Sequence, residues 1–415
     1  MRSISINSEI GQLRRVILHA PGQEIERMTP SNAAEVLYDD ILHLPRALQE
    51  HNQLEYVLSQ VSETCEVMDL LRETMEIDEA RESLLTRLCT AVGYPDEIAS
   101  LRALSSVDLV FALMTGTLKR NDTLERYLSP GLYALPPLPN FFFMRDAAMC
   151  VNDKIITGSM ANRVRVAEAI IMEHIFRWHP GFSPGSFYVD GTLDSSADLT
   201  IEGGDVLILR EDVVCIGNSE RTSIRGIDTL IQSFAEGGTI RHVIVVELPK
   251  ERATIHLDMI FTMVDSDACV VFPPLITGHR ACRTIHVEID NGRVRSIRDR
   301  TNLLTALKSI GLDLEPIPCG GSDPVRQERE QWTSGANFFA FAPGKIIGYG
   351  RNKRTFEELD SRGFRIVRFG ELYDGGVDLS TLGRCAVSIE GAELSRGGGG
   401  CRCMTLPVLR DASPL

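Results

Sequence analysis

Four consecutive glycines, Gly397 to Gly400, stand near the end of the chain and lead into Cys401-Arg402-Cys403. Glycines cannot fill a core, but they let the backbone turn tightly and let another group approach it closely. A cysteine at the end of such a loop, beside an arginine, has surroundings that favour a reactive thiolate. Because the run lies so close to the C-terminus, the other parts of its site must come from far upstream. The fold must therefore bring this loop back to earlier segments.

Composition narrows the class of protein. The chain has 415 residues, 43% of them hydrophobic, which suits two or three domains or one large α/β domain with an insertion. The net charge of −14 argues against a nucleic-acid binder and mildly favours a cationic small substrate. The polar first residues predict no signal peptide, and no apolar run approaches the ~18 residues of a membrane helix. Ten scattered cysteines are typical of reduced thiols, so we expect a cytoplasmic protein without disulfides.

Strands and helices alternate along most of the sequence. We expect strands at 13–18, 154–157, 205–209, 213–216, 242–247, 268–272, 345–349 and 363–368, and helices at 44–61, 167–178, 225–234, 303–310 and 356–361. Two further strands, 283–290 and 293–297, are predicted to form a hairpin across Asn291-Gly292. Between Asp78 and about Gly116 only helices are expected. The glycine motifs of dinucleotide- and phosphate-binding loops are absent. The pattern indicates an α/β protein.

Polar side chains stand at four places where a strand ends or a turn begins. An acid follows an aromatic run at 140–146, and two acids flank a glycine pair before the strand at 205–209. In the segment 253–262, read as extended, alternate residues share a face, so a histidine and an aspartate point the same way. The fourth place is the glycine loop. Each has a structural interpretation by itself: an exposed acid, a turn, a satisfied strand histidine or a structural cysteine. The candidate residues are Asp146, Glu202, Asp205, His256, Asp258 and Cys403.

One chemistry uses all four places, namely attack on a guanidinium group. A guanidinium is planar, delocalised and always protonated, so it is a poor electrophile. An attack on its central carbon needs a strong nucleophile such as a thiolate, and carboxylates that hold the N–H fork by bidentate hydrogen bonds. It also needs a histidine that protonates the departing nitrogen and later activates water. The residues that meet these needs are Cys403, Asp146, Asp258, Glu202 and His256.

In order and spacing, these segments resemble bacterial arginine deiminases, within the superfamily of guanidino-group-modifying enzymes. The resemblance runs nearly from end to end. It is carried by residues 8–11, 19–22, 39–47, 139–146, 202–205, 220–222, 256–258, 322–332 and 397–405. Any one of these motifs is weak, but their order and spacing together are specific.

The resemblance implies a pseudo-fivefold α/β propeller with the active site at its centre. Residues 1–74 and 131–415 would form the catalytic domain, and residues 75–130 an inserted helical domain. The implied reaction is hydrolysis of free L-arginine to L-citrulline and ammonia through a covalent amidino-cysteine intermediate, with no metal or organic cofactor. It also implies a homodimer or higher homo-oligomer in the cytoplasm.

The resemblance also implies roles for single residues. Cys403 would be the nucleophile, His256 the general acid and base, and Asp146 and Asp258 the guanidinium holders, with Glu202 assisting. Asn140, Arg165 and Arg221 would bind the amino-acid end of the substrate, and Asp205 would lie next to that region. Arg402 and Gly400 are further candidate substrate-binding residues. For each of the arginines the alternative is a surface or salt-bridge role.

Three alternatives stay open at this point. The same fold acts on related guanidino compounds in dimethylarginine hydrolases, agmatine deiminases and amidinotransferases, although an arginine pair would be wasted on agmatine, which lacks a carboxylate. A metal hydrolase would use Cys401, Cys403, His256 and nearby acids, but Cys-x-Cys is tighter than the usual zinc spacing. A non-catalytic arginine-binding protein on the same scaffold is the third.

Overall fold

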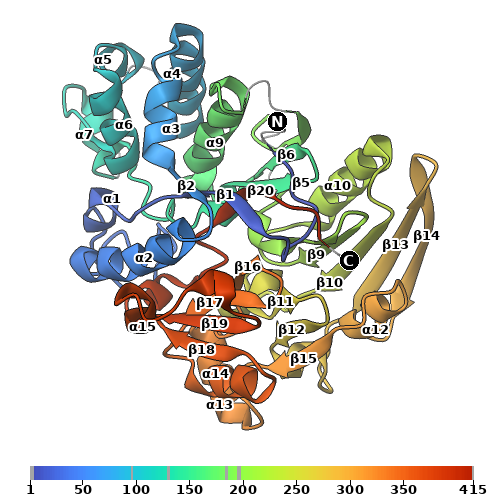
Figure 1. The fold of residues 1–415 in the computed structure, drawn as a ribbon. Coiled ribbons are helices and arrows are strands. Elements are labelled where there is room, and N and C mark those ends of the chain that lie inside the picture. The colour runs from blue at the N-terminus through green and yellow to red at the C-terminus, as the bar shows by residue number, and fades with distance from the viewer. Residues whose placement is uncertain (1–3, 95–96, 129–130, 183–185, 194–197, 414–415) are drawn as a thin grey trace.

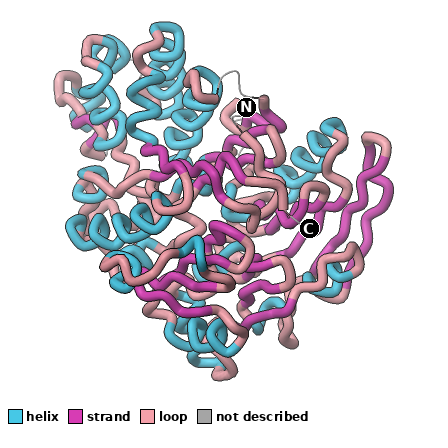
Figure 2. Tube along the Cα trace, in the orientation of Figure 1, coloured by secondary structure: helices cyan, strands magenta, loops and turns pink. Residues whose placement is uncertain are grey.

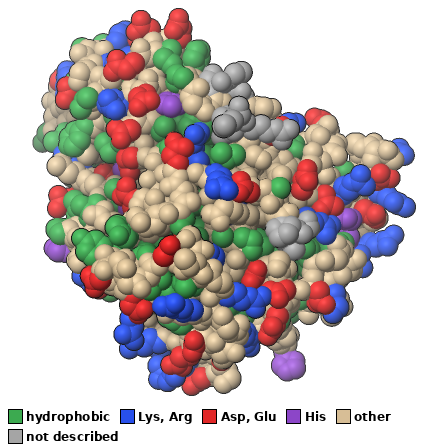
Figure 3. All heavy atoms as spheres, viewed as in Figure 1, with side chains coloured by type: hydrophobic (Ala, Val, Ile, Leu, Met, Phe, Trp, Pro, Cys, Tyr) green, Lys and Arg blue, Asp and Glu red, His purple; other side chains and the backbone are tan. Residues whose placement is uncertain are grey.

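The computed structural model describes residues 4–94, 97–128, 131–182, 186–193 and 198–413. The chain forms a mixed α/β fold in which small sheets occupy the interior and most helices lie toward the outside (Figure 1). No helix among the described residues is long and apolar enough to cross a membrane. On the face drawn in Figure 3, acidic and basic side chains are interspersed.

Five sheets share one arrangement, in which a central strand has an antiparallel partner on one side and a parallel partner on the other. In each group below, the central strand is named first, then its antiparallel partner and then its parallel partner. Two groups are β1 (Leu13–Leu18) with β20 (Leu406–Arg410) and β2 (Glu63–Glu66), and β6 (Lys154–Thr157) with β5 (Ala148–Val151) and β7 (Phe187–Asp190). The others are β9 (Val213–Asn218) with β8 (Val206–Arg210) and β10 (His242–Glu247), β12 (Ala268–Val271) with β11 (Phe261–Asp265) and β15 (Glu315–Pro318), and β17 (Lys345–Tyr349) with β16 (Phe339–Ala342) and β19 (Cys385–Ile389).

Two of these sheets are longer, and a small ladder lies apart. Strands β13 (Thr284–Asp290) and β14 (Arg293–Arg300) extend the β8–β10 sheet, and β18 (Arg365–Arg368) pairs with β19. The predicted hairpin is confirmed: Asn291 has φ +51° and Gly292 has φ +75°, as a tight two-residue turn requires. The separate ladder joins β3 (Thr117–Leu118) to β4 (Tyr133–Leu135).

Helices connect the strands and cover the sheets. They are α1 (Gln23–Glu26), α2 (Leu44–Ser59), α3 (Val67–Thr74), α4 (Asp78–Val92), α5 (Ile98–Arg102), α6 (Ser106–Thr115), α7 (Leu124–Leu128), α8 (Met144–Ala147), α9 (Val166–Trp178), α10 (Ile224–Gly237), α11 (Pro273–Ile276), α12 (Leu303–Lys308), α13 (Pro324–Trp332), α14 (Lys353–Ser361) and α15 (Phe369–Tyr373). Their ends follow local rules. The hydroxyl of Ser223 accepts from the amide of Gly226 and begins α10, while Gly238, at φ +74°, ends it.

The expected helical block is present. Helices α3 to α6 gather against α9 at the upper left of the molecule, and Figure 2 separates this group (cyan) from the strands (magenta) that cross the middle. The described residues from 78 to 116 contain no strand, as predicted. The range 75–130 does contain β3, and residues 95–96 and 129–130, at which one predicted domain boundary falls, lie outside the described part.

The two chain ends meet in one sheet. Strand β20 pairs with β1, and the amide of Ser5 donates to the carbonyl of Val408 at 2.9 Å. This pairing carries the segment before β20, which holds the glycine loop, into the interior of the molecule (Figure 1). The early expectation that the loop returns to upstream segments is therefore confirmed.

Candidate active site

A small cavity lies where distant segments of the chain meet. It measures about 30 Å³ and is lined by Asp146 from α8, by His256 beside the short 3-10 helix Leu257–Met259, and by Cys403 from the turn before β20. The other lining residues are Leu37, Asn140, Phe143, Arg165, Arg221, Arg252, Ile255, Met259 and Gly397 to Gly399. A space of this size holds about one water molecule.

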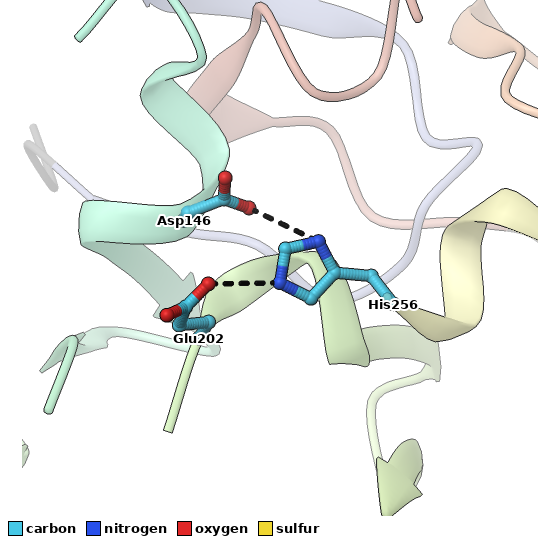
Figure 4. Close-up of side chains that lie close together, drawn as sticks. All are labelled: Asp146, Glu202 and His256. Carbon is cyan, nitrogen blue, oxygen red and sulfur yellow. Dashed lines mark hydrogen bonds and ion pairs between the residues drawn. The ribbon is translucent and has the colours of Figure 1, made fainter. Parts of the chain in front are cut away.

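The ring of His256 lies between two carboxylates, each facing one nitrogen (Figure 4). Nε2 is 3.0 Å from Oε2 of Glu202, and Nδ1 is 3.7 Å from Oδ1 of Asp146. Burial alone would lower the pKa of His256, but the charge of Asp146 and the hydrogen bond to Glu202 raise it to about 9. The imidazole is therefore protonated at neutral pH.

Glu202 is fully buried and holds its charge through its partners. The amide of Ala161 donates to Oε1 at 3.1 Å, and the guanidinium of Arg221 lies 3.6 Å from Oε2. Burial would raise the pKa of Glu202, but the hydrogen bond from His256 and the charge of Arg221 lower it to about 2. The neighbouring Gly204 is required here, because a Cβ at that position would lie 2.5 Å from Cγ of His256.

Asp258 is held by two linked, buried ion pairs, which join Glu9 to Arg402 and Arg402 to Asp258. Arg402 donates to Oδ2 of Asp258 at 2.8 Å, and its other nitrogens bind both carboxylate oxygens of Glu9 at 2.9 and 3.1 Å. A further hydrogen bond runs from Arg402 to the carbonyl of Val206. The side chain of Arg402 is therefore committed to Asp258 and does not line the cavity, although the resemblance had placed it with the substrate-binding residues.

Cys403 lies beside the same aspartate. Its Sγ is 3.7 Å from Oδ2 of Asp258, and its amide donates to Oδ1 of Asn337 at 3.3 Å. Burial and the charges of Asp258 and Asp146 raise the pKa of the Cys403 thiol well above its usual value. The charge of Arg402 lowers this pKa, as expected from the sequence, but burial and the two carboxylates outweigh it, since Arg402 is itself paired with Glu9 and Asp258.

The second cysteine of the loop has a different environment. Cys401 is fully buried in an apolar cluster, and burial raises the pKa of its thiol. The two glycines nearest the sulfur differ as well: Gly399 lines the cavity, whereas Gly400 packs against Asn337, where a Cβ would lie 2.6 Å from the amide oxygen. Gly400, which was predicted to bind substrate, therefore faces Asn337 and does not line the cavity.

Asn140, Arg165 and Arg221, which were predicted to bind the amino-acid end of the substrate, line the cavity. They differ in how many hydrogen-bond donors remain without a partner. Arg165 donates to Oδ2 of Asp146 at 2.6 Å and to Glu168 at 2.8 and 3.0 Å. Asn140 lies beside it and donates to the carbonyl of Val36. Arg221 is also buried, but its Nε has no hydrogen-bond partner among the described residues. Unfilled donors therefore remain mainly on Arg221.

Asp205 supports the site from behind. Its Oδ2 accepts from the hydroxyl of Ser219 at 2.6 Å, and its Oδ1 accepts from the amide of Leu257 at 2.9 Å. Burial raises the pKa of Asp205 to about 7. Because both oxygens are occupied and the residue does not line the cavity, Asp205 positions the 3-10 turn that follows His256.

One predicted local structure is wrong. The segment 253–262 is not extended: it contains the 3-10 turns Arg252–Thr254 and Leu257–Met259 before β11 begins at Phe261. Sequence reasoning assigned no role in the site to Glu9, Asn337, Phe143 or Arg252. The motif 8–11 marked Glu9, but nothing in the sequence links it to Arg402.

Comparison with known proteins gives the family. The family model for arginine deiminase matches residues 34–410. The chain belongs to the arginine deiminase family. Arginine deiminases of Bacillus cereus (strain B4264) and Bacillus thuringiensis subsp. konkukian (strain 97-27) are both 33% identical to it, with 98% of each chain covered. The resemblance drawn from the sequence motifs is confirmed.

Solved structures share the fold at lower identity. The N-terminal domain of ArgZ, a cyanobacterial arginine dihydrolase bound to product, has a TM-score of 0.53 at 14% identity, covering 96% of this chain and 99% of that chain. DDAH from Pseudomonas aeruginosa, as a cysteine-to-serine mutant complexed with citrulline, has a TM-score of 0.51 at 15% identity, covering 95% and 99%. This α/β fold is thus one that guanidino-modifying enzymes use.

Proposed function

We propose that this protein hydrolyses free L-arginine to L-citrulline and ammonia through an amidino intermediate on Cys403. The observation that carries the proposal is a pair of buried carboxylate oxygens, Oδ1 of Asp146 and Oδ1 of Asp258, neither of which has a hydrogen-bond partner among the described residues. Buried acceptors without donors are costly. A guanidinium fills both acceptors with its N–H groups.

The two ends of the cavity differ in the charge they offer. Asp146 and Cys403 line one end of the cavity, and Asp258 lies 3.7 Å from the sulfur outside this lining, so this end suits a planar cation. Arg221 has unfilled donors, and we propose that it binds the α-carboxylate together with Asn140 and the remaining N–H of Arg165. A ligand with a cation at one end and a carboxylate at the other matches this arrangement.

The first half of the reaction uses the bound cation to activate the thiol. A guanidinium beside Cys403 offsets the carboxylates that raise the thiol pKa, so the sulfur loses its proton more readily in the complex. The Sγ then bonds to the guanidinium carbon. As the tetrahedral intermediate collapses, one C–N bond breaks and His256 gives its proton to the departing ammonia.

The second half restores the enzyme. The neutral imidazole takes a proton from a water molecule that attacks the amidino carbon, and the C–S bond then breaks. As it breaks, the hydroxyl proton of the adduct passes to the leaving sulfur and restores the thiol, while the oxygen remains on the carbon as the ureido group of citrulline. The proton that the thiol released at the start leaves with ammonia as ammonium. Glu202 keeps His256 protonated at the start of the cycle and oriented throughout.

A metal-dependent variant has weaker support. Asp146, Glu202 and His256 do offer three ligand atoms within 4.8 Å of one another. However, Arg165 and Arg221 already compensate these two carboxylates, so a metal ion would sit between two guanidinium groups. We therefore propose a reaction without metal, and treatment with a chelator followed by metal analysis tests this.

We further propose the finer organisation of the molecule. The five sheets with one shared strand arrangement support a pseudo-fivefold propeller, with residues 75–130 as an inserted helical domain. We also propose a cytoplasmic homodimer or higher homo-oligomer that binds no nucleic acid.

Mass spectrometry of the enzyme quenched during turnover tests the mechanism. We expect an amidino adduct on the peptide that carries Cys403, and citrulline and ammonia as products from arginine. Agmatine and methylated arginines serve as competing substrates. Turnover of one of these without citrulline from arginine would refute the proposed substrate, and an adduct on Cys401 would refute the assigned nucleophile.

A further inference from the structure

Arg252 stands between the reactive cavity and an outer one. The outer cavity, of about 240 Å³, is lined by Asp39, Asp40, Arg252, Ala253, Met259, Trp332, Ser395, Arg396 and Gly398. The two cavities share Arg252, Met259 and Gly398. Asp146, His256 and Cys403 line the inner cavity, so a substrate whose guanidinium reaches them would direct its α-carbon end toward this shared wall.

We propose that Arg252 is a specificity-determining residue that binds the substrate α-carboxylate together with Arg221. The inference rests on the proposed function, because it assumes that a guanidinium occupies the end of the cavity lined by Asp146 and Cys403. It adds a residue that neither the sequence motifs nor the resemblance had marked.

The first argument is a shortage of donors on the other arginines. A carboxylate offers two oxygens with about four acceptor positions. Arg165 is largely committed, since its Nε and Nη2 bind Glu168 and its Nη1 binds Asp146. Arg221, Asn140 and the one free N–H of Arg165 leave acceptor positions of a bound carboxylate for a further cation on the same wall.

The second argument is that Arg252 is available at low cost. Its Nε binds Asp39 at 2.9 Å, and its Nη2 binds the carbonyl of Leu37 at 2.7 Å. In the described part of the chain, its Nη1 makes no hydrogen bond. The carboxylate of Asp39 is 60% exposed, and an exposed ion pair contributes little. A substrate carboxylate can therefore replace Asp39 without a large penalty.

The third argument is space. Gly398 has φ +88°, and a Cβ built on it would lie 3.6 Å from Nη2 of Arg252. Bare backbone therefore faces the guanidinium on this side. Arg252 lines both cavities, and no side chain stands between its guanidinium and Gly398.

Ligands that differ only in the carboxylate test the proposal. We would measure dissociation constants of arginine, argininamide and agmatine by calorimetry in Cys403→Ser protein, with and without Arg252→Gln or Arg252→Lys. We expect Arg252→Gln to weaken arginine binding about 10- to 100-fold, as the loss of one charge-assisted hydrogen bond implies. Argininamide and agmatine should change little, and Arg252→Lys should recover part of the loss.

A matched control separates recognition from support of the loop. Asp39→Asn breaks the same ion pair but keeps the arginine, so arginine should bind as well as before or more tightly. In the active enzyme, Arg252→Gln should raise KM for arginine and leave kcat nearly unchanged. An equal loss for all three ligands, an equal loss in Asp39→Asn, or no loss would overturn the proposal. If the wild type releases no citrulline, the proposed reaction fails, but the binding series still decides the role of Arg252.

Discussion

Replacing Glu202 by glutamine should move the pH dependence of the enzyme toward acid. Glutamine has nearly the same size and can still accept from the amide of Ala161, so the change removes one charge beside His256 and Arg221 and keeps the shape of the site. At present this charge helps to hold the pKa of His256 at about 9. The proposed first step needs protonated His256, so the alkaline limb of kcat/KM should lie near that value in the wild type.

The size of the shift follows from the contact. Oε2 of Glu202 is 3.0 Å from Nε2 of His256, and both side chains are buried. A hydrogen bond to a charged group contributes about 1.5–3 kcal/mol, and about 1.36 kcal/mol corresponds to one pKa unit. Removing the charge should therefore lower the pKa of His256, and move the alkaline limb, by about one to two pH units. Asp146 remains and keeps part of the elevation.

Two measurements check this result. The first is citrulline release as a function of pH, and the second is a histidine NMR titration in Cys403→Ser protein, with His256→Asn to assign the signal. Glu168→Gln is the matched control, because Glu168 is buried beside Arg165 and does not contact His256. An unchanged limb in Glu202→Gln, or an equal shift in both variants, would refute the reasoning.

Three shorter predictions concern the loop and its support. Cys403→Ser should abolish citrulline release while arginine still binds, whereas Cys401→Ser should be mild because that thiol packs in an apolar cluster. Gly399→Ala should reduce kcat strongly and cost about 1–3 kcal/mol in urea unfolding, since its Cβ would overlap the ring of Phe143. Glu9→Gln should cost about 3–5 kcal/mol near neutral pH, because it removes one of the two buried carboxylates that compensate the guanidinium of Arg402. The folded-state pKa of Glu9 is lowered to about 2, so its contribution is present above about 4.5 and is lost as the pH falls toward 2. Unfolding curves of wild type and Glu9→Gln should therefore converge in acid.

The strands that the sequence predicted best are short apolar runs between turn residues. The bounds of β1, β6, β10 and β17 agree with the prediction, and so does the hairpin at Asn291-Gly292. These segments are buried or capped by strong local turns, so local composition decides them. Strands β2 and β15 were missed because they lie at sheet edges and have mixed composition, and their pairing comes from tertiary contacts.

At the site, residue types were predictable but their connections were not. Chemistry alone assembled the cysteine, the histidine and the three acids, and the structure brings these five residues together. The turn after His256 was predicted to be extended because its cause is distant: the amide of Leu257 binds Asp205, 52 residues earlier. Likewise, the partner of Arg402 is Glu9, 393 residues away, and no local pattern encodes that distance.

The position of the nucleophile depends on both ends of the chain. Cys403 precedes β20, which is held by β1, and Arg402 binds Glu9 just before β1 begins. Arg410, at the end of β20, donates to the carbonyl of Gly11, so the same short N-terminal stretch fixes the strand and the arginine that aims Asp258. These contacts between the two ends of the chain therefore help to position both the sulfur and the carboxylate beside it. This explains how a glycine loop, which has little stiffness of its own, can hold a reactive group in place.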